Sequence, residues 1–276
     1  MRRGLLLALL ALGMGVWVSL FYIEIAPMEE NVSFSVLILQ LSGSSWRFPL
    51  NASMDGLLDF FLRLIPCFAF QAAVGIWIYR NYCTASVYVF SRLPGRLGWY
   101  GACVGRIAGA AAGYEALFLL AAAATAALRF EIYWDPLGWR LLAWHFVLYV
   151  LWLYAATLLV NLAAIRKGSS AAYAAVVGGQ LLLTALFYPL REDPGNAALT
   201  AARAAVLRWN PAVCLVLGWQ TGTWPWTLDL ESPYPGLSLE TSVLILFALA
   251  LAVTLLGAAV VKRHDLLIAD LETGGN

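Results

Sequence analysis

Six long apolar stretches constrain the fold of this chain more than any other feature of its sequence. They lie near residues 4–23, 57–79, 107–128, 141–165, 170–190 and 241–261. A helix that crosses the hydrocarbon core of a bilayer needs about 20 mainly apolar residues. Because 62% of the 276 residues are hydrophobic and only 12% are charged, against about 25% charge in soluble domains, lipid is the expected solvent. The sequence therefore predicts an all-α integral membrane protein of six transmembrane helices, forming a single domain over 1–276.

The first apolar stretch follows the basic start MRRG, as the apolar part of a signal peptide would. It is longer than the about 7–15 residues of such a segment, and no A-x-A cleavage site follows it. We therefore expect an uncleaved membrane helix. The basic pairs at 166–167 and 262–263 follow the fourth and sixth stretches. Because Lys and Arg favour the cytoplasmic side of a membrane, both termini are expected in the cytoplasm.

The two longer outer segments are expected to hold structure of their own. In the first, VSFSVLILQLSG (32–43) fits either a strand or a short interfacial helix. In the second, NAALTAARAAVLRW (196–209) has the pattern of an amphipathic helix, and the apolar run from Ala212 to Trp219 is too short to span. Non-spanning backbone is tolerated at membrane depth where it is packed in protein or lines a cavity. We therefore expect a re-entrant outer element between the fifth and sixth helices.

Several common site chemistries have no motif in this chain. Its two lysines lie in IRKG and VVKR, and neither fits the GxxxxGK[ST] loop that cradles phosphates. HExxH and GxSxG are absent, and the four cysteines show no CxxC spacing, so we predict no metal site and no disulfide. A net charge of +1 gives no general attraction for nucleic acid.

The polar side chains within predicted spans include Glu115, His145 and Gln180. A charge at the membrane centre costs roughly 2.5–3.5 kcal/mol on insertion scales, so one interpretation is that Glu115 lines a path or pairs with a partner. The other is that Glu115 is protonated, or hydrogen-bonds to Gln180, Asn161 or Tyr114. His145 is interpreted as a packed, hydrogen-bonded helix residue rather than a catalyst.

Glycines recur every four residues in RLGWYGACVGRIAGAAAGYE (96–115). They are Gly101, Gly105, Gly109 and Gly113, and this spacing places them on one helical face. Small residues at such spacing let two helix backbones approach closely. The glycine stripe therefore predicts tight packing of the third helix against a neighbour, either in this chain or in a second copy.

The stretch just before the third helix, YRNYCTASVYVFSRLPGRLGWYGACVGR (79–106), interleaves aromatic residues with arginines. A break at Pro94–Gly95 is expected to separate two short helical pieces. One interpretation is an interfacial loop with snorkelling arginines. The other is a docking segment for a cytoplasmic protein.

Taken as a layout, the whole chain resembles the six-helix permease subunits of ABC-2-type ATP-binding-cassette exporters. The shared features are the basic N-terminus, the arginine-containing turn YVFSRLPGRLGWYG after the second span, a short outer element after the fifth span and a sixth span ending in KR. By this resemblance SRLPGR (91–96) meets the ATPase, which makes Arg92, Arg96, Trp99 and Tyr100 candidates for the coupling contact. NPAVCLVLGW (210–219) resembles the family's re-entrant element.

The resemblance implies a transport subunit of the bacterial plasma membrane, without an ATPase site or cofactor of its own. A second permease copy or homologue would complete the substrate path, and separate ATPase subunits would bind ATP and Mg²⁺. The apolar, aromatic lining suggests export of an amphipathic or hydrophobic substrate. Two other classes stay open: a non-transporting anchor or regulatory subunit, and a lipid-acting enzyme in which Glu115 and His145 converge on one cavity.

Overall fold

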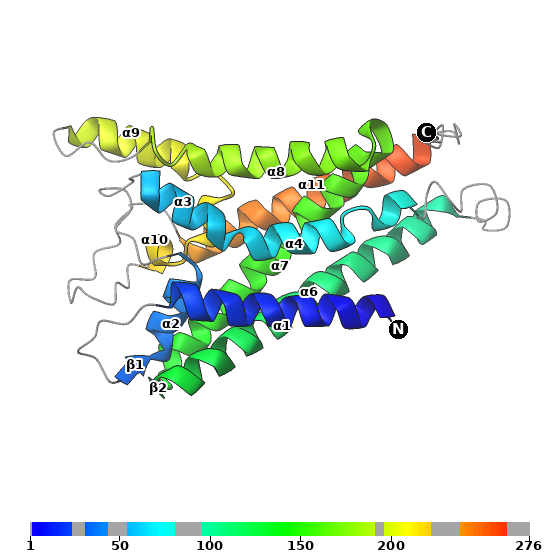
Figure 1. The fold of residues 1–276 in the computed structure, drawn as a ribbon. Helices are drawn as coiled ribbons and strands as arrows, with labels where there is room; N and C mark the ends of the chain where they lie inside the picture. The colour runs from blue at the N-terminus through cyan, green and yellow to red at the C-terminus, as the bar shows by residue number, and fades with distance from the viewer. Residues whose placement is uncertain are drawn as a thin grey trace.

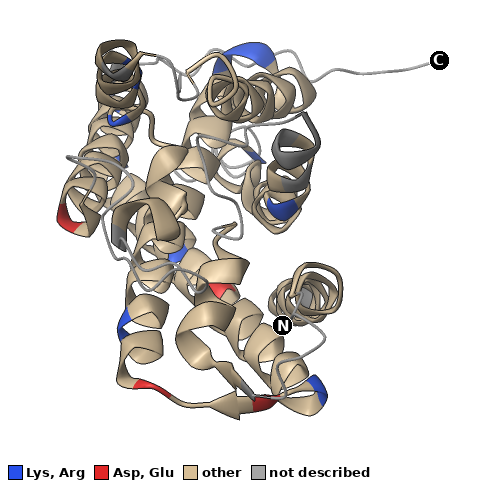
Figure 2. Cartoon of the chain, turned by 90° about the vertical axis from the view of Figure 1, so that its left-hand side faces the viewer, with Lys and Arg blue, Asp and Glu red and all other residues tan. Residues whose placement is uncertain are grey.

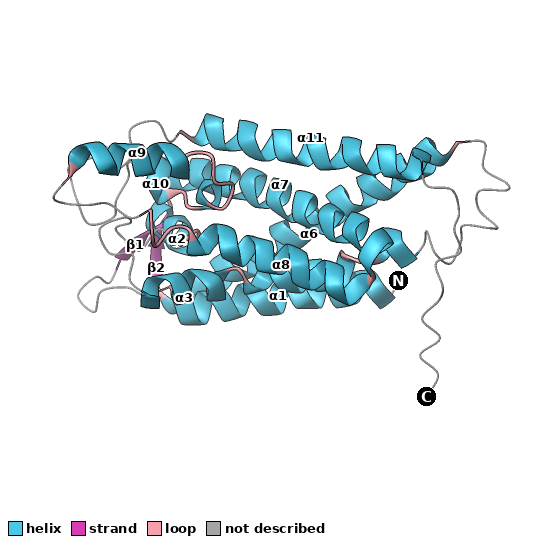
Figure 3. Cartoon of the chain, turned by 90° about the horizontal axis from the view of Figure 1, so that it is seen from above, coloured by secondary structure: helices cyan, strands magenta, loops and turns pink. Residues whose placement is uncertain are grey.

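A computed structural model of the protein describes residues 2–23, 31–43, 54–80, 95–190, 196–221 and 238–263. Its long elements are all helices, and most of them run along one common direction (Figures 1 and 3). In chain order the elements are α1 (Arg2–Tyr22), β1 (Asn31–Ser33), α2 (Phe34–Leu41), α3 (Met54–Arg63), α4 (Ile65–Val74), α6 (Arg96–Arg129), β2 (Glu131–Tyr133), α7 (Pro136–Lys167), α8 (Ser169–Ala185), α9 (Ala197–Leu207), the 3-10 helix η1 (Val213–Leu215), α10 (Gly218–Thr221) and α11 (Leu239–Arg263).

The start of α1 and the end of α11 lie at the same end of the bundle (Figure 1). Hydrogen bonds between helix ends agree with this arrangement. Arg129 at the end of α6 donates to the carbonyl oxygen of Ser19 at 2.7 Å, so α1 and α6 end together. Tyr100, near the start of α6, donates to the carbonyl oxygen of Thr254 at 3.0 Å, so α6 begins beside the last part of α11.

Among the described residues, five helices are long and apolar enough to cross a membrane, so the expected sixth crossing is not confirmed. They are Gly4–Tyr22, Phe60–Arg80, Arg96–Arg129, Pro136–Lys167 and Leu239–Lys262. The expected fifth span, 170–190, is α8 with 17 residues, about 25 Å long, followed by turns at 186–190. Pro189 accounts for the early end, because proline disfavours helical backbone at the residue before it and cannot continue the hydrogen-bond ladder.

Apolar side chains cover much of the outer surface of the bundle. Large exposed examples on α1 and α11 are Leu5, Leu6, Leu9, Phe21, Leu244, Phe247, Leu255 and Leu256. Lysine, arginine, aspartate and glutamate colour only small parts of the ribbon (Figure 2). A water-soluble protein rarely exposes so much contiguous apolar surface, so these helices belong to a membrane-embedded protein.

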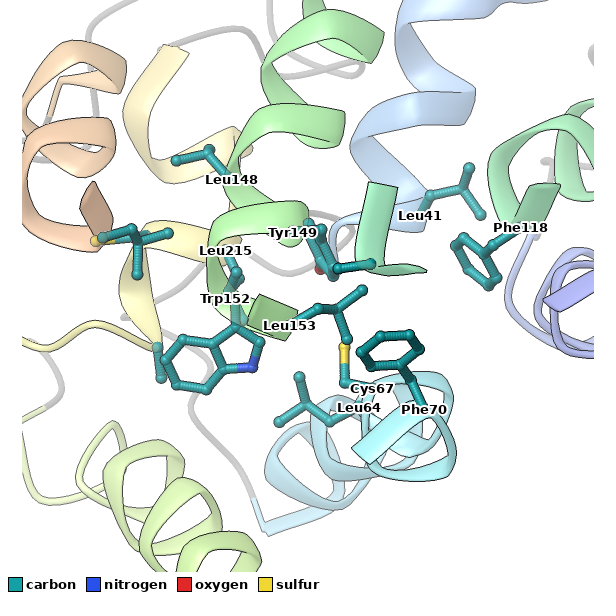
Figure 4. Close-up of a cluster of buried hydrophobic side chains, with 14 of the residues drawn as sticks. Leu41, Leu64, Cys67, Phe70, Phe118, Leu148, Tyr149, Trp152, Leu153 and Leu215 are labelled. Carbon is teal, nitrogen blue, oxygen red and sulfur yellow. The ribbon is translucent and has the colours of Figure 1, made fainter. Parts of the chain in front are cut away.

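Helix α7 lies at the centre of the bundle and packs against α2, α4, α6, α8 and α11. Leu148, Trp152 and Leu153 of α7 are each 3% exposed or less. In the close-up of the core, Leu153 lies next to Cys67 and Phe70 of α4 (Figure 4). Because α7 contacts so many neighbours, a change in one of its side chains can affect the packing of most other helices in the bundle.

The α7–α8 connection is a single residue. Gly168 adopts φ 77° between Lys167 and Ser169, a left-handed backbone that favours glycine. Helices α7 and α8 therefore form a tight helical hairpin.

A small parallel sheet joins two segments about 100 residues apart in the chain. Asn31 pairs with Glu131 and Ser33 with Tyr133. Just beyond it, the Asp135 carboxylate accepts from the backbone N–H of Gly138 at 3.0 Å and of Ser35 at 2.9 Å. Asp135 therefore caps the first turns of α7 and α2 together. The alternating run 32–43 is thus part strand and part short helix.

Candidate functional site

Two ionisable side chains meet inside the bundle, Glu115 of α6 and His145 of α7. His145 Nδ1 lies 3.2 Å from Glu115 Oε1. Glu115 is 2% exposed and His145 is 0% exposed. An uncompensated charge at such a place is costly, so close pairing of acid and base is the arrangement expected there.

The surroundings of the pair are aromatic. The His145 ring stacks on Tyr149, one helical turn further along α7, with centroids 4.0 Å apart and an interplanar angle of 3°. Tyr114 donates to the carbonyl oxygen of Pro66 at 2.9 Å, which joins α6 to α4 next to Glu115. Both nitrogens of His145 and Oε1 of Glu115 have no hydrogen-bond partner among the described residues. The pair is thus a close electrostatic contact with unsatisfied hydrogen-bonding capacity.

The hydrogen-bond partners expected for Glu115 are engaged elsewhere. Gln180 exchanges two hydrogen bonds with Gln71 of α4, at 3.0 and 2.8 Å. Asn161 accepts from the Ile78 N–H at 2.8 Å and donates to the Val74 carbonyl oxygen at 3.4 Å, and so bridges the break after α4. The recorded hydrogen bonds of Gln180, Asn161 and Tyr114 thus go to groups other than Glu115, and the side chain that α7 presents to Glu115 is His145.

The coupling residues expected near 92–100 are only partly within the described structure. Arg92 lies outside the described residues. Arg96 and Trp99 lie in the first turns of α6. Tyr100 is 3% exposed and its ring lies against Gly257 of α11, where an added Cβ would overlap the hydroxyl oxygen. Tyr100 therefore joins α6 to α11 and presents little surface to another protein.

The glycine stripe is exposed and does not pack against any described helix. A Cβ added at Gly101, Gly105, Gly109 or Gly113 would meet no described atom within 4 Å. The expected packing of the stripe within the chain is therefore not seen among the described residues, and packing against a second copy stays a prediction.

The packed face of α6 contains Ala111, Ala122 and Ala126, each 0% exposed. Here α1 approaches at Gly15, where an added Cβ would lie 2.8 Å from the Ala121 Cβ. Small residues do allow α6 to pack closely, but they are alanines facing a glycine of α1.

The predicted amphipathic helix over 196–209 is confirmed as α9. Beyond it, residues 212–220 are all buried. Asn210 donates to the carbonyl oxygen of Leu183 at 2.7 Å, and Gln220 donates to carbonyl oxygens of this segment, the shortest being that of Cys214 at 2.9 Å. Burial raises the pKa of the Cys214 thiol to about 11. These amides satisfy a buried, irregular backbone that contacts α7 and α11.

Sequence reasoning missed Gln71, Gly15 and Gly257. Gln71 is a polar residue in an apolar span, which is a signal for an interhelical hydrogen bond. Gly15 follows Gly13 by two residues in α1, and Gly257 is the single glycine of α11. No spacing pattern distinguishes Gly15 and Gly257 from glycines such as Gly13, which meets no described atom.

No family model, curated protein or solved structure matches this chain. Within the described residues, no three His, Cys, Asp or Glu side chains are grouped so as to hold a metal ion. The site is therefore interpreted from its own geometry.

Proposed function

We propose that this protein is the membrane permease subunit of an ATP-driven ABC exporter, powered by separate ATPase chains. In this proposal α8 is the sixth crossing helix, shortened at its outer end. The support is that α1 begins and α11 ends at one end of the bundle (Figure 1), which requires an even number of crossings.

The observation that carries the proposal is the length and position of α6. It has 34 residues against 21 in α1, and Arg129 holds the two helices level at their ends. The excess, about 20 Å of helix, therefore extends beyond α1 at the end where the chain begins. A helix of this length can project from the bilayer and carry Arg96 and Trp99 toward a partner protein.

Helix α6 also has contacts suited to passing a movement into the membrane. Tyr100 contacts α11 at Thr254 and Gly257, and Glu115 contacts α7 at His145. A push by closing ATPase subunits on the projecting turns would shift α6 as one rigid element against α7 and α11. Two permease subunits that move in this way would open a central path first to one side of the membrane and then to the other.

The outer end of the bundle supports the same proposal. Residues 212–220 are buried between α9 and α11, and we propose that this segment is the re-entrant element of the permease. The proposed substrate is amphipathic or hydrophobic, since the interior is mainly apolar. ATPase activity of the complex should then respond to such compounds and not to a hydrophilic solute.

The test is co-purification of the full chain, tagged, with the proteins encoded beside its gene. We expect an ATPase in stoichiometric amount, which is lost when Arg92 and Arg96 are both changed to alanine. Arg140→Ala is the matched control, because Arg140 is exposed in the first turns of α7 at the opposite end. An ATPase retained by the double variant would exclude the coupling site, and recovery of the chain without any ATPase would overturn the proposal.

A lipid-acting enzyme is the second candidate, favoured by the 3.2 Å approach of Glu115 and His145. The burial of both side chains argues against a catalytic role, since a catalytic group must reach its substrate. It predicts that Glu115→Ala or His145→Ala abolishes lipid turnover by the purified chain alone.

A further inference from the structure

The Glu115–His145 contact supports an inference that does not depend on the exporter proposal. The two side chains are 3.2 Å apart and come from different helices. Neither reaches the surface, with 2% and 0% exposure. The chain therefore places one acid and one base together where lipid and packed side chains exclude water.

None of the described groups that interact with Glu115 is a second carboxylate. Cys67 of α4, Tyr114 of α6 and Tyr149 of α7 interact electrostatically with Glu115. The nearby cation is Arg63 of α3, which acts on Tyr149 and donates its own hydrogen bond to the carbonyl oxygen of Gln40. The charge balance at the contact is therefore set mainly by the protons on Glu115 and His145.

The number of protons on the pair follows from the cost of a net charge. With no proton the pair is an anion, and with two it is a cation, and either charge is expensive in an apolar interior. With one proton the pair is neutral overall. We propose that Glu115 and His145 form a proton-binding site in the membrane interior, and that the pair together holds one proton, on one residue or the other.

A single shared proton gives the α6–α7 interface a specific property. While the residues touch, a carboxylate beside an imidazolium is stabilised by the short separation. If α6 moves from α7, the N–H bond at Nδ1 breaks and an O–H bond forms at Oε1, so that both charges vanish. No proton is exchanged with water, and the interface can open without exposing a charge to lipid.

The number of protons on the Glu115–His145 pair can be measured because the chain has few histidines. It has 2 histidines, so His264→Gln leaves His145 as the single imidazole in the full-length protein. In lipid nanodiscs, the ¹⁵N shifts of labelled histidine report whether this ring is charged. Infrared difference spectra against Glu115→Gln report whether Glu115 is a carboxylate or a carboxylic acid, and Glu115→Asp replaces that variant if it does not fold.

Four outcomes are possible, and each decides the proposal. An imidazolium with a carboxylate, or a neutral imidazole with a carboxylic acid, gives one proton and supports it. An imidazolium with a carboxylic acid gives two protons, and a neutral imidazole with a carboxylate gives none, and either result overturns it.

Thermal stability supplies an independent measurement. If the pair shares its proton, Glu115→Gln and His145→Gln should each lower Tm, and the double variant should lose no more than the larger single loss. Gln180→Leu is the control, since it removes a different buried polar contact and should leave the His145 spectrum unchanged. Additive losses for Glu115 and His145 would overturn the shared-proton site.

Discussion

The hydroxyl of Tyr100 occupies the space that a side chain at Gly257 would need. The ring of Tyr100 is buried at the start of α6, and its hydroxyl donates to the carbonyl oxygen of Thr254, three residues before Gly257 on α11. This contact joins the start of α6 to the last helix of the bundle. It is a direct mechanical link between the two elements at the end where the chain begins.

We predict that Gly257→Ala destabilises the protein by about 1–3 kcal/mol, the usual cost of overpacking a close contact. The added methyl group would overlap the Tyr100 side chain. Thermal or denaturant unfolding in detergent measures the loss. Combining it with Tyr100→Ala should recover part of it, because the space is then vacant, whereas two independent losses would contradict the contact.

Gly109→Ala should have the opposite effect on stability. An added Cβ at Gly109 meets no described atom, and alanine favours helix over glycine by about 0.5–1 kcal/mol. We therefore expect a small gain in the stability of the solubilised monomer. If a second copy packs on the glycine stripe, the same substitution should reduce dimer yield in chemical cross-linking, and an unchanged yield would exclude that packing.

The Gln71–Gln180 pair predicts a non-additive double mutant. Each amide donates to the other, so Gln71→Leu or Gln180→Leu alone leaves a buried amide without its partner. Interhelical hydrogen bonds in membranes contribute about 0.6–2 kcal/mol, and the orphaned group adds its own desolvation cost. We expect the double leucine variant to unfold at a higher temperature than the worse single variant. A lower temperature would show that the two amides act independently.

Asp135 should matter more than an ordinary helix cap. Its two carboxylate oxygens serve the backbone of two helices, α7 and α2, and loss of one cap typically costs about 0.5–2 kcal/mol. Asp135→Ala is expected to exceed the effect of Asn196→Ala, which removes the cap of α9 alone. Equal losses in thermal unfolding would show that the Ser35 contact contributes nothing.

Hydropathy located most helices within a few residues because a bilayer crossing demands a long apolar run. The exceptions are α6, which begins at Arg96 rather than near residue 107, and α8, where Pro189 ends the helix before the apolar sequence ends. Hydropathy did not predict the rotation of each helix about its own axis, which decides which face is buried. Gly109 and Ala111 are equally small and two residues apart, yet only Ala111 is buried. Which one faces a neighbour depends on packing across the whole bundle.

The partner of Glu115 could not be chosen from the sequence for the same reason. Gln180, Asn161 and His145 all stand in neighbouring spans, and each could reach a carboxylate for some rotation of its helix. The pairing of Asn31 with Glu131 is likewise invisible along the chain, because three-residue strands carry almost no pattern. These contacts are decided by tertiary structure.

Cys214 gives a prediction for chemical labelling and for pH dependence. Burial raises the pKa of its thiol from the ordinary 9.0 to about 11, so at pH 8 only about one thiol in a thousand is the reactive thiolate. A variant whose single cysteine is Cys214 should therefore resist maleimide until it is denatured. A matched variant with its single cysteine from Ala202→Cys, at an exposed position of α9, should react at once.

The same shift sets the sign of a stability change at high pH. The unfolded chain loses the Cys214 proton near pH 9 and the folded chain only near pH 11, so over this window the folded state binds more protons. Stability should therefore fall as pH rises from 9 to 11, by at most about 1.4 kcal/mol per pH unit from this group. Cys214→Ala removes the group and should flatten the pH profile of Tm over that window. An unchanged slope in the variant would show that Cys214 is not held protonated by the fold.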